Sequence, residues 1–139
     1  MKPFSKRIVL IDRQLYWREI SARILRSAGF IVCTLDTYNY ISAENCWEGA
    51  APDLAVLGCA YIGPEEQKLI AHILAQKHHL LVLCVSLPWQ VMRSLFLQGV
   101  DDVVDKPYDS VHLVNFVNQV LESTLSRNIY QAVERNGVS

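Results

Sequence analysis

Five short apolar runs, separated by longer stretches with helical periodicity, constrain the fold of this chain more than any other feature. Each run is rich in Val, Ile and Leu and lacks polar alternation. Such runs are typical of strands that are covered on both faces, as in a parallel sheet. The sequence therefore predicts five parallel strands, at residues 7–12, 30–35, 53–57, 80–86 and 102–105.

The stretches between these runs fit amphipathic helices. From Trp17 to Ala28, apolar residues recur at steps of three and four, and Gly29 follows as a helix end. A second helix begins at Pro64, in the favoured first position, and a third covers 88–98. A weaker helical pattern covers 37–49. Strands that alternate with helices predict an α/β fold, a doubly wound five-stranded parallel sheet with helices on both faces.

The last helical pattern is longer than the sheet requires. It starts near Asp109, and a stripe of apolar residues follows it at four-residue steps: Val117, Leu121, Leu125, Ile129 and Val133. A stripe that continues past the sheet has nothing of its own domain to cover, so it predicts either a contact with a partner helix or a frayed tail. We divide the chain into a domain at 1–122 and a C-terminal helical extension or tail at 123–139.

Length and composition agree with one such domain. The chain has 139 residues, 51% of them hydrophobic and 19% charged, so it can bury a core and is not intrinsically disordered. Its longest apolar run, 80–85, is far below the roughly 20 residues of a membrane span. Lys and Arg number 13 against 14 Asp and Glu, with no basic run, which gives no support for a nucleic-acid surface. We expect a cytoplasmic protein that binds neither membranes nor nucleic acid.

The four cysteines lack the spacing of a metal site, and we expect no metal and no cofactor. Most of them lie inside apolar runs, which favours small buried hydrophobic side chains. Cys59 is also a candidate redox sensor, but strand alternation turns it away from Gly58 and favours burial. The four are Cys33, Cys46, Cys59 and Cys84.

Polar and small residues follow the predicted strands, at the edge where open α/β sheets bind their ligands. Read in chain order, these strand ends carry Asp12 and Arg13, then Gly58, Ser86 and Lys106. We expect these five residues to form one pocket.

This arrangement resembles the receiver domains of two-component response regulators, over about residues 6–122. The resemblance rests on Asp12, its distance from Gly29, Pro52–Asp53–Leu54 at the start of the third run, Ser86, and Gly99-Val-Asp-Asp followed by Lys106–Pro107. It implies the strand order 2-1-3-4-5, a signalling role without enzymatic activity, and a cis peptide before Pro107.

Three departures from the family pattern indicate a degenerate receiver. The acidic pair after the first strand is Asp12–Arg13, the slot of the phosphate-accepting aspartate holds Gly58, and the aromatic switch position falls at Val103. With Lys106, the pocket has a net charge of +1, whereas the family's pocket is acidic and binds Mg²⁺. We therefore expect neither Mg²⁺ binding nor an acyl phosphate.

Two hypotheses follow for the altered pocket. In the first, Arg13 and Lys106 converge on Asp12 and hold the pocket in one fixed state, because a buried carboxylate needs partners. In the second, Arg13, Ser86 and Lys106 bind a small anion or a phosphorylated metabolite. A flavin-binding relative is a third class, but the loop after the first run lacks the Ser, Thr and Gly that would cradle a phosphate.

We expect the chain to act by binding a signalling protein, a second copy of itself, or both. By resemblance, the surface spans the helix at 88–98, the strand at 102–105, which carries Val103, and the last helix. The apolar stripe of the last helix supports this surface independently, as a short oblique contact rather than a long coiled coil. Trp89 either anchors a partner or packs over its own loop.

Overall fold

The computed structural model describes residues 6–36, 51–85, 87–106 and 108–135, and the side chains of these up to residue 123. Five strands form one parallel sheet in the order β2-β1-β3-β4-β5, so the predicted fold and strand order are confirmed. The strands are β1 (Arg7–Asp12), β2 (Ile31–Leu35), β3 (Leu54–Cys59), β4 (Leu80–Val85) and β5 (Asp102–Lys106). The described helices are α1 (Leu15–Ser27), α2 (Pro64–Ala75), α3 (Trp89–Gln98) and α4 (Ser110–Arg135).

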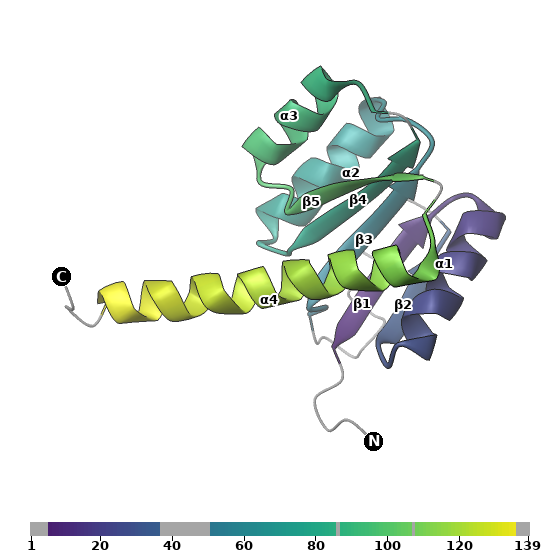
Figure 1. Cartoon of the computed structure of the whole chain (residues 1–139). Helices are drawn as coiled ribbons and strands as arrows, with labels where there is room; N and C mark the ends of the chain where they lie inside the picture. Colours follow the sequence, from purple (N-terminus) through teal and green to yellow (C-terminus); the bar gives the residue numbers. More distant parts are fainter. Residues whose placement is uncertain (1–5, 37–50, 86, 107, 136–139) are drawn as a thin grey trace.

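Helices cover both faces of the sheet, as Figure 1 shows. On one face, Leu69, Ile70 and Ile73 of α2 and Leu95 of α3 pack on the strands. On the other face, α1 contributes Ala22 and Leu25, and α4 contributes Leu113, Val117 and Val120. All six residues of β3 are buried, because the central strand of a doubly wound sheet has a helix layer on each side.

The helix ends follow the sequence signals. Gly99 follows α3 with φ 109°, in the left-handed region where glycine has no Cβ penalty. Pro64 is the first residue of α2, and the preceding Gly63 N–H donates to Glu66 Oε1 at 2.9 Å. The predicted helix at 37–49, Ser86 and the expected cis peptide before Pro107 lie outside the described residues.

Helix α4 extends beyond the sheet, as the yellow end of the ribbon shows in Figure 1. Its 26 residues span about 39 Å at a rise of 1.5 Å per residue. Val120 is the last residue of α4 among the buried core residues, and Leu121 is partly buried against that core. The side chains of Leu125, Ile129 and Val133 lie outside the description. No described helix is both long and apolar enough to span a membrane.

The described cysteines divide into two kinds, and Cys46 lies outside the described residues. Cys59 and Cys84 are buried free thiols, as predicted. The prediction of a simple buried thiol was wrong for Cys33, which is half-buried on β2 and takes part in a disulfide. Sequence spacing alone does not reveal such a bridge, since it depends on which cysteines the fold brings together.

Candidate functional site

A buried ion pair lies at the carboxyl edge of the sheet. Lys106 Nζ, at the end of β5, lies 3.0 Å from Asp12 Oδ2, at the end of β1. The two side chains are 0% and 2% exposed. The second carboxylate oxygen, Oδ1, accepts the Gln14 backbone N–H at 2.9 Å. Both oxygens of Asp12 are therefore engaged, which offsets the cost of burying a charged group.

Gly58 lies beside Asp12 and leaves the space that its carboxylate fills. The two residues are register partners on β3 and β1. A Cβ atom on residue 58 would lie 2.8 Å from Asp12 Cγ and closer still to Oδ2. Real Cβ atoms do not approach other heavy atoms so closely. The ion pair in this geometry therefore requires glycine at position 58.

Aromatic side chains cover the lysine. Lys106 Nζ lies 4.9 Å from the centre of the Trp17 ring, within cation–π range. The Trp17 ring packs at 5.5 Å on Tyr108. The Tyr108 hydroxyl forms a hydrogen bond with the Ser21 hydroxyl of α1. Burial raises the pKa of Tyr108, and the Ser21 hydrogen bond partly opposes that effect. Trp17, from α1, therefore covers the buried lysine, and Tyr108, two residues before α4, packs on Trp17.

Sequence reasoning did not assign Trp17 and Tyr108 to this site. The helical pattern of α1 accounted for Trp17 as an apolar-face residue, which it also is. Its position could have been predicted, because a residue five positions after Asp12 lies in the first turn of α1, close to the end of β1. Tyr108 lies two residues after Lys106 and shares the same edge.

Of the two cations expected to converge on Asp12, Lys106 pairs with it, whereas the ion pair of Arg13 is with another carboxylate. Arg13 forms its ion pair with Glu65 at the start of α2, with Nη2 2.5 Å from Oε2. The two side chains are 49% and 64% exposed, so this pair contributes little to stability. Arg13 lies in the bend after the end of β1, where its side chain reaches Glu65.

The structure gives no support to the alternative of an anion pocket. Lys106 is buried against Asp12 and covered by Trp17, and Arg13 pairs with Glu65 at the surface. The third residue of that pocket, Ser86, lies outside the described residues. Of the described side chains, no cluster of three or more His, Cys, Asp and Glu could hold a metal ion.

The residues predicted for an interaction surface fall in different environments. Trp89 is 65% exposed at the start of α3, so it does not bury itself over its own loop. Val103 is partly buried against the core on the α2–α3 side. Val117 was wrongly placed on the surface, because its side chain is 0% exposed in the core beneath α4. Leu121 is only partly buried.

Comparison with known proteins identifies the fold. No protein-family model matches the sequence, and no curated protein sequence matches it significantly. Solved structures match closely. NtrX from Brucella abortus superposes with a TM-score of 0.81 at 20% identity, over 98% of this chain and 31% of the NtrX chain. A CheY-like receiver domain protein from Methanospirillum hungatei gives 0.74 at 18% identity, over 89% of this chain and 99% of its own.

The chain has the receiver fold. A response regulator from Thermotoga maritima matches 86% of this chain and 99% of its own, with a TM-score of 0.74 and 18% identity. Part of this chain therefore lies outside the match to these short receiver proteins, and the chain spans about a third of the length of NtrX. In this receiver fold, the slot that the family resemblance assigns to the phosphate acceptor is Gly58, and Asp12 occupies the space above it.

Proposed function

We propose that this chain is a signalling module with the receiver fold that acts without phosphorylation of its own site and without enzymatic activity, by binding a protein partner. The observation that carries the proposal is the buried pair of Asp12 and Lys106 above Gly58. The pair supplies internally the positive and negative charges that a metal and a phosphoryl group would otherwise bring.

The donor set does not fit the Mg²⁺ that the fold family implies. Mg²⁺ prefers near-octahedral oxygen ligands and usually takes one or two carboxylates. Here one carboxylate oxygen of Asp12 accepts a hydrogen bond from the Lys106 ammonium, and the other accepts a hydrogen bond from the Gln14 N–H. Position 58 offers no side chain, so no carboxylate remains there to form an acyl phosphate. Phosphoryl transfer needs positioning and charge neutralisation by such groups.

Two measurements on the whole chain test this part of the proposal. Isothermal titration calorimetry with Mg²⁺ should give no binding heat, and incubation with acetyl phosphate should give no phosphate adduct by intact-mass spectrometry. A receiver domain with a complete acidic pocket serves as the positive control for both. Saturable Mg²⁺ binding at millimolar concentration, or an acid-stable or acid-labile phosphate adduct, would contradict it.

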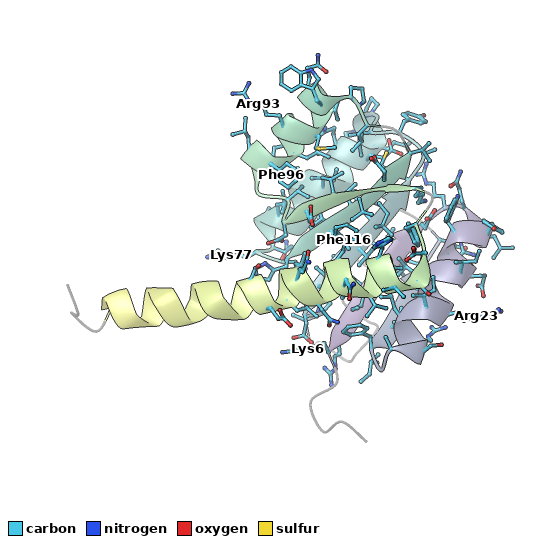
Figure 2. The ribbon with its side chains drawn as sticks, in the orientation of Figure 1. Lys6, Arg23, Lys77, Arg93, Phe96 and Phe116 are labelled. Carbon is cyan, nitrogen blue, oxygen red and sulfur yellow. The ribbon has the colours of Figure 1, made fainter. Side chains whose placement is uncertain are left out.

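The surface of α3 supports a partner-binding role. Trp89, Phe96 and Leu97 are 65%, 44% and 77% exposed, a set of large apolar side chains on one short helix. Figure 2 labels Phe96 and Arg93 on α3. Exposed aromatic side chains next to an arginine are the composition of binding hot spots. We assign the protein-binding surface to α3 and the adjoining strand β5.

We assign self-association to the C-terminal segment 123–139, which begins within α4. Support comes from the apolar stripe at Leu121, Leu125, Ile129 and Val133, and from the length of α4 beyond Val120, the last buried residue among its described side chains. We expect the whole chain to be a dimer and a chain truncated after Glu122 to be a monomer by light scattering. The variant Trp89→Ala is the matched control and should remain a dimer. A whole chain that is monomeric at high concentration, or a truncated chain that still dimerises, would exclude this contact.

A further inference from the structure

Two free thiols lie side by side at the carboxyl edge of the sheet. Cys59 is the last residue of β3, Cys84 lies one residue before the end of β4, and they are register partners. Both belong to the core on the α2–α3 side, so their side chains lie on the same face of the sheet. They are 3% and 0% exposed. The Cys84 thiol donates to its neighbour Val85 O at 3.8 Å. The mechanism proposed above uses neither of them.

The spacing of the pair suits a covalent bridge. Neighbouring strands lie about 4.7–4.9 Å apart, and register partners on parallel strands have nearly this separation between their Cα atoms. Disulfides accept Cα separations of about 4.4–6.8 Å. Because the two cysteines are register partners and belong to the same core, a bond between them requires side-chain rotation and no rearrangement of the strands.

The surroundings give the two thiols different roles. The neighbouring Cys59 thiol lowers the pKa of Cys84, and burial of Cys84 opposes this effect without cancelling it. The Cys84 thiol in turn raises the pKa of Cys59, and burial raises it further. Cys84 is therefore the better nucleophile, and Cys59 retains its proton until a second step. Val85, which follows Cys84, is 42% exposed, and Tyr61, two residues after Cys59, is 69% exposed, so the buried pair lies near the surface along the chain.

We propose that Cys59 and Cys84 form a reversible redox site that is oxidised to a disulfide by a hydroperoxide. The Cys84 thiolate attacks one peroxide oxygen, the O–O bond breaks, and the leaving oxygen takes up a proton, which gives a sulfenic acid. Cys59 then loses its proton and attacks the Cys84 sulfur, and the sulfenic oxygen leaves as water. With hydrogen peroxide, the two thiols lose two hydrogen atoms and one peroxide becomes two waters. A dithiol reductant reverses the reaction.

Oxidation at this position joins the ends of β3 and β4. These ends lie next to the Asp12–Lys106 pair in the sheet, since Gly58, the register partner of Asp12, precedes Cys59, and Val85 is the register partner of Lys106. The bond therefore places a covalent constraint on the edge where relatives would carry a phosphoryl group. The proposal does not rest on the proposed function, because its chemistry needs only the two thiols.

Peptide mapping of the whole chain tests the site directly. After exposure to hydrogen peroxide and digestion without reductant, mass spectrometry should find peptides of Cys59 and Cys84 joined and lighter by two hydrogen atoms. Dithiothreitol should separate them. The disulfide of Cys33 provides an internal reference for the mapping. If Cys59 and Cys84 both remain open to alkylation after unfolding, or if they join only to other cysteines, the proposal is wrong.

The matched variants Cys59→Ala and Cys84→Ala test whether both thiols are needed. Circular dichroism first establishes that each variant is folded, and neither should then give the joined peptides. The order of the steps is tested on the wild-type chain, where dimedone added with the peroxide should trap the sulfenic acid on Cys84 at least tenfold more than on Cys59. Equal labelling of the two cysteines would overturn the assignment of the nucleophile.

Discussion

Replacement of Gly58 by alanine tests the central feature of the site, the close packing of Asp12 over a residue without a side chain. A Cβ at position 58 would lie 2.8 Å from Asp12 Cγ. The Asp12 side chain must then rotate, which separates Oδ2 from Lys106 Nζ and Oδ1 from the Gln14 N–H. The substitution thus acts through the ion pair rather than through the local backbone.

The magnitude follows from the pair that is lost. Separation of a buried ion pair costs about 3–5 kcal/mol. Alanine gains about 0.5–1 kcal/mol over glycine by restricting the unfolded chain. We therefore expect Gly58→Ala to lower the free energy of unfolding by about 2–4 kcal/mol, measured by urea denaturation with circular dichroism.

A double-mutant cycle separates this steric mechanism from a general intolerance of alanine. In the background Asp12→Ala with Lys106→Met, the pair is replaced by apolar groups and the space above residue 58 is open. There Gly58→Ala should cost less than about 1 kcal/mol, which gives a coupling energy of at least about 1 kcal/mol. The background Asp12→Asn separates shape from charge, because the amide keeps the shape of the carboxylate without its charge. Gly58→Ala should cost less there than in the wild type, since no ion pair is separated, but more than in the apolar background. An equal cost of Gly58→Ala in the wild type and in the apolar background would refute the reasoning.

Three further predictions concern the groups around the pair. Lys106→Met should lower the free energy of unfolding by about 3–5 kcal/mol in urea denaturation, because it leaves the Asp12 carboxylate buried without its cation; a change below about 1 kcal/mol would mean that the carboxylate finds another partner. Ser21→Ala should cost about 1–3 kcal/mol in the same assay, because Ser21 is 1% exposed and its loss leaves the Tyr108 hydroxyl without this partner; Ser21→Thr, which keeps the hydroxyl, is its control. The pKa of Tyr108 is raised from 10.0 in the folded state, so the stability linked to its neutral form is present below pH 10 and is lost as the pH rises through the folded value. Tyr108→Phe should therefore lose less stability than the wild type above pH 10; identical alkaline profiles would contradict the assignment.

The pattern of the chain was sufficient for the fold and for the position of the site. Apolar runs and helical periodicity depend on residues close in sequence, so the strands and described helices lie within a few residues of their predicted positions. The carboxyl ends of parallel strands meet at one edge, which is why Asp12, Gly58 and Lys106 could be assigned to one pocket before their distances were known. The strand order came from the family resemblance rather than from periodicity.

The partners of the charged groups could not be read from the sequence. Arg13 is next to Asp12 in the chain, yet Lys106, 94 residues away, is the cation on its carboxylate. Arg13 instead has an acidic neighbour at the start of α2, Glu65, and a half-exposed position. Val117 belongs to a stripe that continues to Val133, but the sheet reaches far enough under α4 to bury it. The partner of each charged group and the burial of Val117 both depend on how the strands and helices are placed relative to one another in the folded chain.

The sequence by itself therefore determined the layers, the edge that carries the site and the absence of an acidic side chain at position 58. Only the tertiary structure decided that the Asp12 carboxylate fills the space above Gly58, that Trp17 and Tyr108 cover Lys106, and that Cys59 faces Cys84. The physical reason is that periodicity is a local property of the chain. A contact between two side chains depends on the register and spacing of strands that are distant in sequence.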